Sequence, residues 1–232
     1  MKEVIILAGG FGTRLKSVIN DKPKCLAEVN ERPFISYLVD SLLKYNYNRF
    51  IFSLGYLKEH VIEYIMTTYP NLNVVFSVEE QPLLTGGAIR LALDYVKSDS
   101  VLILNADTYL GIDLNCLYQY HIKENLDITI TLKPLYNFDR YGSVKFDKEK
   151  KILSFDEKQL TDFGYINCGY IYIKKNILNN YPINSPFSFE KDFINKHLDL
   201  FKINAFIDES YFIDIGIPED YLKASLDFKN IF

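Results

Sequence analysis

The residues of this sequence that could do chemistry on a phosphate begin with a glycine-rich loop. Gly9-Gly10-Phe11-Gly12-Thr13-Arg14 directly follows the apolar run Val4–Ala8, which is predicted to be a strand. Such glycines let the backbone approach a ligand and aim its N–H groups at phosphate oxygens, and Arg14 adds a planar, permanently charged donor. The alternative is a plain strand-to-loop turn, but the position after the first strand favours a phosphate site. No Gly-Lys-Ser/Thr follows, so the loop is not a Walker A motif.

A lysine and a second glycine-containing loop could serve the same ligand. Lys24 follows Pro23; alone it reads as a solvated loop lysine, but beside the glycine loop it is a second candidate phosphate contact. Gln81–Ala88 separates a predicted strand from a predicted helix. It is either an ordinary loop with Thr85 as the helix N-cap, or a site where Gln81 bonds a base and the helix N–H groups face phosphate.

Two acids stand where packing gives them no purpose. Asp107 closes Asn105-Ala106-Asp107 at the end of a predicted strand, and Asp214 interrupts the apolar run Phe212–Ile215. A buried carboxylate costs several kcal/mol unless it is paired or bound to a metal. Mg²⁺ favours one or two carboxylates together with substrate phosphates, so we expect a shared Mg²⁺; salt bridges to Lys or Arg are the competing account.

The second half holds weaker signals. Glu157-Lys158 closes the predicted strand Ile152–Phe155, and period two puts Asn167 and Gly169 on one face of the next strand. A glycine beside an amide leaves space for a hydroxylated ring. The alternatives are a solvated ion pair at Glu157-Lys158 and a β-bulge at Gly169.

No general base stands out. His60, His121 and His197 form no pattern, and no Ser/His/Asp or Cys/His arrangement is evident. A phosphate monoester has a second pKa of ~6, so at neutral pH it is already a nucleophile. If a phosphate oxygen is the nucleophile, the reaction needs no general base, only charge neutralisation and in-line positioning.

These residues need a sheet to position them. Apolar runs alternate with segments whose apolar residues lie three and four apart, which predicts a parallel sheet with helices on both faces. The strands expected are Val4–Ala8, Phe50–Leu54, Val74–Val78 and Val101–Leu104, and the helices centre on Ile35–Leu43, Val61–Ile65 and Ile89–Leu93. Ligands bind beyond the carboxyl ends of such strands, where the polar insertions after Ala8, Val78 and Leu104 fall.

The second half is richer in strands, several of them expected to be antiparallel. The strands expected are Ile128–Leu132, Ser143–Phe146, Ile152–Phe155 and Tyr165–Ile173, with helices at Phe189–Leu198 and Pro218–Leu226. We expect one domain over 1–232, with a nucleotide-binding part over about 1–135 and a sugar-phosphate part over about 136–232.

The composition argues against nucleic-acid-binding, membrane-surface, disulfide-rich and secreted proteins. The chain has 232 residues, 48% of them hydrophobic, and 26 basic against 30 acidic groups give net charge −4. It can therefore bury a core, and it lacks the basic excess of a nucleic-acid or anionic-membrane surface. Three scattered cysteines argue against a disulfide framework or a zinc site, and the apolar run near the N-terminus is too short for a signal peptide. We expect a cytoplasmic protein.

Taken together, these residues resemble the sugar-1-phosphate nucleotidyltransferases, whose pattern is a GGxGTRL loop followed by Pro-Lys. The resemblance runs from Leu7 to Tyr221 and implies a Rossmann-like, three-layer α/β/α fold with a mixed sheet and a small substrate-side β subdomain. Four segments resemble the D-glycero-α-D-manno-heptose 1-phosphate guanylyltransferases, which make GDP-heptose for bacterial surface glycans: Phe138–Gly142, Ser154–Lys158, Phe187–Glu190 and Phe212–Tyr221.

The resemblance also implies residue roles. Arg14 and Lys24 would be the catalytic contacts to the nucleotide phosphates, Asp107 and Asp214 would hold Mg²⁺, and Lys158 would bind the sugar phosphate. The other nucleotide-binding residues implied are Leu7, Ala8, Gly9, Gly10, Gly12, Thr13, Gln81, Thr85, Gly86 and Asn105, and the other sugar-side residues are Tyr141, Gly142, Glu157 and Asn167. Gln81 offers a donor and an acceptor, so it does not choose among guanine, cytosine and uracil.

We therefore expect an enzyme that joins a nucleoside triphosphate, GTP on the resemblance, to a sugar 1-phosphate, releasing pyrophosphate. The sugar implied is D-glycero-α-D-manno-heptose; a homo-oligomer is compatible with the sequence. One alternative is another substrate pair: mannose or glucose 1-phosphate, or CTP, UTP or dTTP with a different phosphate. The others are a metal-dependent glycosyltransferase, because Asn105-Ala106-Asp107 loosely echoes Asp-x-Asp, and a non-catalytic nucleotide sensor.

Overall fold

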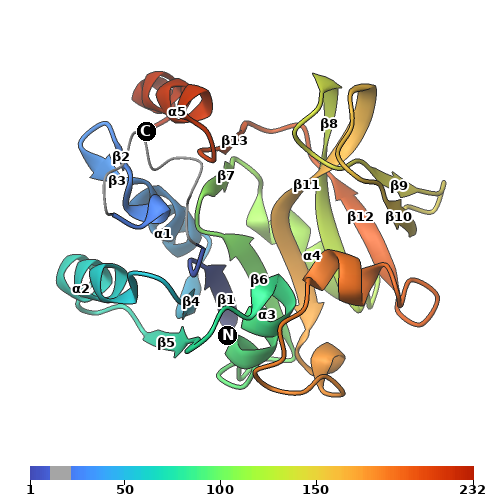
Figure 1. Ribbon diagram of the computed structural model, residues 1–232, viewed down its shortest axis with the longest axis horizontal. Helices are drawn as coiled ribbons and strands as arrows, with labels where there is room; N and C mark the ends of the chain where they lie inside the picture. Colours follow the sequence, from blue (N-terminus) through green and yellow to red (C-terminus); the bar gives the residue numbers. More distant parts are fainter. Residues whose placement is uncertain (11–21) are drawn as a thin grey trace.

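A seven-stranded mixed sheet forms the centre of the protein (Figure 1), whose computed structural model describes residues 1–10 and 22–232. The strand order is β12-β8-β11-β6-β1-β4-β5, and β11 runs antiparallel to both of its neighbours while the other pairs are parallel. These strands are β1 (Lys2–Leu7), β4 (Tyr47–Leu54), β5 (Val74–Val78), β6 (Ser100–Asn105), β8 (Ile128–Phe138), β11 (Thr161–Lys174) and β12 (Ile203–Ile207). The predicted mixed α/β sheet is confirmed.

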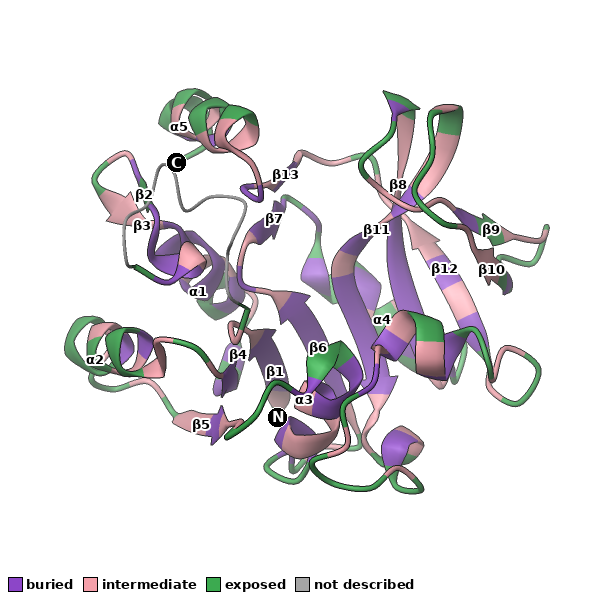
Figure 2. Ribbon diagram, viewed as in Figure 1, coloured by how far each residue is buried: buried purple, intermediate pink, exposed green. Residues whose placement is uncertain are grey.

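Helices cover both faces of this sheet because its strands are apolar on both sides. Alternate residues of β1 show the division: Val4 and Ile6 join one buried cluster, and Ile5 joins the other. The first cluster packs under α1 (Phe34–Lys44), α2 (Lys58–Thr68), α4 (Leu114–Lys123) and α5 (Pro218–Ile231), and the second under α3 (Leu84–Leu93) and the π-helical turn Phe189–Ile194. Figure 2 shows the sheet largely buried between these layers, which confirms the three-layer arrangement.

The N-termini of α4 and α5 are each set by a residue suited to a helix start. The Asp113 carboxylate accepts hydrogen bonds from the backbone N–H groups of Asn115 (2.8 Å) and Cys116 (3.3 Å) and so caps α4, satisfying donors that have no partner inside the helix. Pro218 stands at the first turn of α5, where its fixed φ and missing N–H are tolerated. Helix α4 was not predicted from the sequence, and α5 was expected to end at Leu226, short of its observed end at Ile231.

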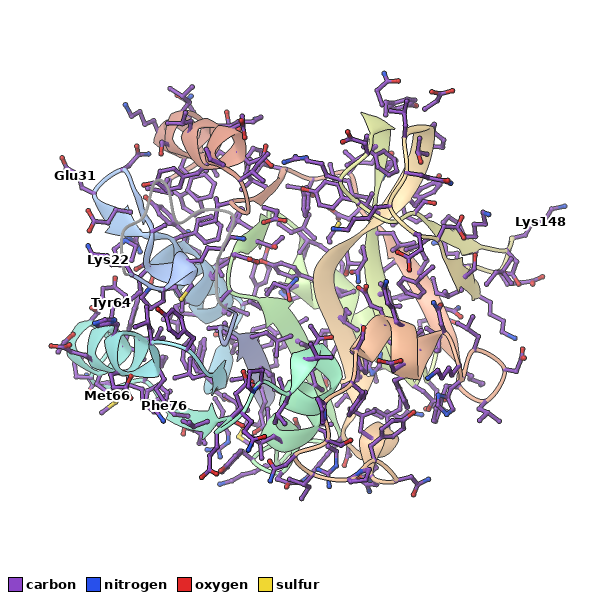
Figure 3. All side chains as sticks on the ribbon, in the orientation of Figure 1. Lys22, Glu31, Tyr64, Met66, Phe76 and Lys148 are labelled. Carbon is purple, nitrogen blue, oxygen red and sulfur yellow. The ribbon has the colours of Figure 1, made fainter. Side chains whose placement is uncertain are left out.

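Three two-stranded ladders and two short 3-10 helices complete the described chain. The ladders pair β2 (Glu28–Val29) with β3 (Arg32–Pro33), β7 (Thr108–Leu110) with β13 (Phe212–Asp214), and β9 (Val144–Phe146) with β10 (Ile152–Phe155); the 3-10 helices are Lys24–Leu26 and Lys175–Leu178. The β9–β10 hairpin extends from the sheet, with Lys148 at its outer end pointing into solvent (Figure 3). The part boundary expected near residue 135 falls inside β8, so both parts share one sheet.

One predicted helix and one predicted strand pattern are wrong in detail. Phe189–Leu198 is not an α-helix: the Phe193 N–H donates to the Ser188 carbonyl, five residues back, and the resulting π-helical turn ends at Ile194. In β11 the register shifts between Asn167 and Ile171, and Gly169 has φ +72°. Gly169 therefore sits in a bulge, the alternative that the sequence left open, and the expected period-two alternation breaks there.

No described helix combines the length and apolarity that a membrane crossing needs.

Replacing Gly169 with alanine should destabilise the fold. Its φ is strained for a residue with a side chain, and a Cβ there would lie 2.5 Å from Asn105 Nδ2. We expect Gly169→Ala to lower the free energy of unfolding, measured in urea, by about 1–3 kcal/mol. Gly111→Ala is the matched control, because the nearest atom to its added Cβ would be 3.7 Å away. Equal losses in the two variants would contradict this account.

Candidate active site

A cavity of about 500 Å³ lies at the carboxyl ends of β1, β4, β5 and β6, the edge where α/β sheets bind ligands. Among the predicted site residues, the cavity brings together Leu7, Ala8, Gly9, Gly10, Lys24, Thr85, Asn105, Asp107 and Asp214. Its described lining also includes Cys25, Ser53, Glu79, Pro82, Leu84, Ala88, Ala106 and Gly216. The structure thus joins residues from five separate segments that the sequence singled out one by one.

Lys24 is the cation between the two predicted acids. Its Nζ lies 2.5 Å from Asp107 Oδ2 and 3.4 Å from Asp214 Oδ1. The lysine side chain is 12% exposed, and the acids are 32% and 24% exposed, so solvent screens the three charges only in part. The salt bridges that were the alternative to a metal site are therefore present. Their cation is Lys24, which was predicted to contact a phosphate.

The β7–β13 ladder explains why the two acids meet. Asp214 pairs across the ladder with Thr108, and the Ile215 N–H donates to the Asp107 carbonyl at 3.0 Å. Gly216 is required beside them, because a Cβ there would lie 2.9 Å from Asp214 Oδ1 and 3.1 Å from Lys24 Nζ. Neither Gly216 nor this pairing was predicted.

The cluster carries excess negative charge. Burial, and after it the charge of Asp107, raises the pKa of Asp214, although Lys24 acts in the opposite direction. Among the described residues of the cluster, two carboxylates against one ammonium leave a formal charge of −1, so the acids fit a further cation. Within residues 1–10 and 22–232, no group of three or more His, Cys, Asp and Glu side chains could hold a metal by itself. The donor set suits Mg²⁺, which completes its shell with water and substrate phosphates.

The cysteine in the lining is not an activated nucleophile. Burial, with a further contribution from Asp107, raises the pKa of Cys25 to about 12. The thiolate is the reactive form of cysteine, so Cys25 stays protonated and inert at neutral pH.

The structure places three residues of the loop Gln81–Ala88, whose roles in binding a base stay predictions. Gln81 is exposed and lies outside the described lining of the cavity. Gly86 faces Phe187: its N–H donates to the Phe187 carbonyl at 2.8 Å, and a Cβ there would lie 2.2 Å from the Phe187 ring. Thr85 is not the N-cap, since α3 begins at Leu84; its Oγ1 accepts from the Phe189 N–H at 3.0 Å.

Glu79, a partly buried carboxylate in the cavity wall, was not predicted from the sequence. Burial raises its pKa, and a hydrogen bond from the Leu83 N–H acts in the opposite direction. Glu79 comes directly after β5. An acid at the end of a predicted apolar strand is the signal that identified Asp107, and it could have identified Glu79 as well.

None of the predicted sugar-side residues belongs to the described lining of the cavity. Gly142 lies against Asp156 and Glu157, since a Cβ on Gly142 would be 2.4 Å from the Asp156 carbonyl oxygen. The Tyr141 ring packs edge-on against Phe212 of β13, 6.1 Å between centroids. Burial and then Asp214 raise the pKa of Tyr141, so this loop reaches the acid cluster.

Asn167 contacts a second acid that the sequence analysis did not select. Its Nδ2 donates to Glu190 Oε1 at 2.5 Å, and its Oδ1 accepts from the Gly169 N–H at 2.9 Å. Glu157 is exposed and pairs with Lys191 at 2.7 Å, and Lys158 is exposed. The space expected beside Gly169 is not open to a ligand: the Asn105 side chain fills it.

Gly12, Thr13 and Arg14 lie outside the described residues. Their roles, like those of the other assigned residues, stay predictions.

Comparison with known proteins identifies the relatives of this arrangement. Residues 3–230 match the family described as nucleotidyl transferase. The chain is 38% identical over 228 residues to the D-glycero-alpha-D-manno-heptose 1-phosphate guanylyltransferase of Aneurinibacillus thermoaerophilus, covering 98% of this chain and 99% of that one. It is 39% identical over 219 residues to the enzyme of that name from Campylobacter jejuni, covering 94% and 96%. The crystal structure of HddC from Yersinia pseudotuberculosis complexed with GMP-PN is similar with a TM-score of 0.88 and 38% identity, covering 98% of this chain and 100% of that one.

We expect turnover to depend on both carboxylates of the acid cluster. Asp107→Asn and Asp214→Asn each remove one charge that the cluster offers to a cation. Metal-assisted charge stabilisation contributes several kcal/mol, so we expect pyrophosphate release to fall about 100-fold or more in either variant, with unchanged circular dichroism. Asp199→Asn, at an exposed position, is the control. Near-normal Mg²⁺-dependent turnover in either cluster variant would refute the metal role.

Asp214→Asn, which should lower turnover, should raise the stability of the fold at neutral pH. The pKa of Asp214 is raised in the folded protein, so ionising Asp214 lowers the free energy of unfolding. This loss is absent below the pKa of about 3.9 that an aspartate has in the unfolded chain. It grows as the pH rises toward the pKa of Asp214 in the folded protein, and it is complete above that pKa. We expect Asp214→Asn to melt at a higher temperature than the unsubstituted protein at pH 7, and the difference to vanish near pH 3.5. A lower Tm at pH 7 would show that pairing with Lys24 outweighs burial and repulsion.

Proposed function

The chain belongs to the nucleotidyl transferase family, and on that premise we propose that it transfers GMP from GTP to D-glycero-α-D-manno-heptose 1-phosphate. The products are pyrophosphate and GDP-heptose. The near-full-length similarity to enzymes named for this reaction supports the substrate pair, as does the likeness to a structure complexed with GMP-PN.

The single observation that carries the proposal is the position of Lys24 between Asp107 and Asp214 in the cavity wall. The cavity, about 500 Å³, falls in the range of roughly 300–1,000 Å³ typical of small-molecule sites. Gly9 and Gly10 line the cavity together with the acid cluster, and Tyr141 lies beside the acids. A nucleotide and a sugar phosphate would meet at the cluster.

The chemistry needs little beyond this charge arrangement. An oxygen of the sugar phosphate attacks the α-phosphorus of GTP, the new P–O bond forms, and the bond from the α-phosphorus to the bridging oxygen of pyrophosphate breaks. The attacking oxygen is already ionised at neutral pH, so no general base is required. Lys24 neutralises charge on the phosphates, and the cavity holds the reacting groups in line.

Mg²⁺ is part of the proposal. Asp107 and Asp214 would hold the ion, which when bound supplies Lewis-acid neutralisation of the phosphate oxygens. The excess negative charge of the cluster and the raised pKa of Asp214 support this, because a second cation would relieve the repulsion between the two carboxylates.

On the sugar side, Lys158 would bind the phosphate, and Glu157, Asn167 and the Gly142 backbone would bind hydroxyls. The contact of Gly142 with Asp156 supports this grouping. We place the reaction in the cytoplasm. Cys25, Cys116 and Cys168 are all unpaired, as expected of a reducing compartment.

A matrix of nucleotides and sugar 1-phosphates tests the proposal. We expect GTP with D-glycero-α-D-manno-heptose 1-phosphate to give the highest kcat/KM for pyrophosphate release. A site that leaves buried polar groups unpaired can reject a wrong base by ~10⁴-fold. Preference for CTP, UTP or dTTP would refute the guanylyl assignment alone, and faster turnover of mannose 1-phosphate would refute the heptose assignment alone. Transfer of a sugar without pyrophosphate release would overturn the reaction class.

A further inference from the structure

We infer that Arg140 is a positioning residue for the sugar side of the site, because its ion pair with Asp220 holds the segment Asp139–Gly142 against the first turn of α5. The inference rests on the proposed function, since it requires a sugar phosphate to bind beside Tyr141 and Gly142. It gives a role to two residues that had none, and it makes sugar-phosphate binding depend on a contact within the protein.

The segment Asp139–Gly142 has little support from its own backbone. β8 ends at Phe138 and β9 begins at Val144, so the segment lies between two strands and belongs to neither. Among the described residues, no backbone group of the segment makes a hydrogen bond to another backbone group. A stretch without such bonds opens easily, so side-chain contacts decide where it lies.

Arg140 makes the contact that holds the segment. Its Nη2 lies 2.7 Å from Asp220 Oδ2, and the two side chains are 40% and 18% exposed. The guanidinium also lies over the ring of the neighbouring Tyr141, 5.5 Å from the ring centroid, which adds a cation–π attraction. One side chain thus pairs with an acid on another element and orders the ring beside it.

Asp220 is a fixed partner for this arginine. It lies in the first turn of α5, where the helix dipole favours an acid. The helix buries Ala224 and Phe228, and the Phe228 ring contacts those of Phe34 and Tyr37, with centroids 5.8 and 4.7 Å apart. Because α5 is packed in this way, it cannot follow the segment when the segment moves.

The ion pair connects the segment to the stretch of chain that carries one acid of the cluster. β13 ends at Asp214 and leads directly into α5, which begins at Pro218 (Figure 1). Tyr141 makes a second contact with this stretch, its ring edge-on against Phe212 of β13. If the segment opened, Tyr141 and Gly142 would move relative to Asp214, beside which the phosphates are proposed to bind.

Loss of the ion pair should weaken the binding of one substrate and not of the other. A sugar phosphate binds while the segment is in place, so its apparent affinity scales with the fraction of molecules in that state. The proposed nucleotide contacts Gly9, Gly10 and Lys24 line the cavity, and no residue of the segment belongs to its described lining. Nucleotide binding should therefore stay intact.

Arg140→Gln and Asp220→Asn each remove one charge of the pair, and the double variant removes both. An ion pair of this exposure corresponds to roughly a 3- to 10-fold effect. We expect each single variant to raise KM for D-glycero-α-D-manno-heptose 1-phosphate by that factor, with KM for GTP and kcat unchanged. Because both residues act through one contact, the double variant should show no larger rise. Arg140→Lys keeps a charged donor for Asp220 and should retain most of the affinity.

Limited proteolysis gives a readout that needs no turnover. Chymotrypsin cuts after an accessible Tyr, and its rate follows the population of the open segment. We expect cleavage after Tyr141, identified by mass spectrometry, to be faster in both single variants. Arg32→Gln is the matched control: it breaks the ion pair of another arginine, with Asp40, whose side chain is 39% exposed in the folded protein on the arginine side. It should change neither this cleavage nor KM for the sugar phosphate.

The possible results separate the inference from the proposed function. An unchanged KM for the sugar phosphate in folded Asp220→Asn would overturn the inference, even if Arg140→Gln failed to fold. A rise confined to Arg140→Gln would also overturn it, because it would mean that Arg140 acts without Asp220. Failure of the unsubstituted protein to release pyrophosphate from GTP and the heptose phosphate would instead refute the proposed function. Unchanged cleavage after Tyr141 in both single variants would still show that the ion pair does not hold the segment.

Discussion

The pairing of β13 with β7 is the constraint on which this site depends. The ladder is three residue pairs long, yet it sets Asp214 opposite Thr108 and so beside Asp107. Without it, Asp107 would end a strand with one lysine partner, and Asp214 would lie on a distant segment of the chain. The short ladder thus converts two isolated acids into a cluster that binds positive charge.

This arrangement is held against a local electrostatic cost. Two partly buried carboxylates repel one another, and the raised pKa of Asp214 reflects that repulsion together with desolvation. Lys24 offsets part of the cost through its two ion pairs. Groups that a fold holds in an unfavourable state are characteristic of functional sites, where a ligand relieves the strain. The fold tolerates the cluster because the surrounding sheet buries large apolar clusters on both faces.

The segment around Phe187–Glu190 connects the two halves of the site. The Phe187 carbonyl accepts from the Gly86 N–H, and the Phe189 N–H donates to Thr85, so the segment is bound to the start of α3. One residue further, Glu190 accepts from Asn167 on β11. The proposed nucleotide site and the proposed sugar site are therefore linked through hydrogen bonds of a single turn. The glycine that the sequence assigned to the base, Gly86, is needed for this contact.

From the sequence one could predict β1, β4, β5, β6, β8 and β11 of the sheet, the helices α1 to α3, and the two acids Asp107 and Asp214; the edge strand β12 was not predicted. Periodicity and strand-terminating polar residues are local signals, so they can be read without knowing what lies opposite. The sequence also identified Lys24, although its role depended on neighbours that the sequence could not supply. The folded chain was needed to show that Lys24 bridges two acids, that Asn105 fills the space beside Gly169, that Gln81 is exposed, and that Glu79 faces Gly9. Each of these facts depends on contacts between segments far apart in the chain, and such contacts are fixed by packing and strand register, which leave no pattern within a short stretch of sequence.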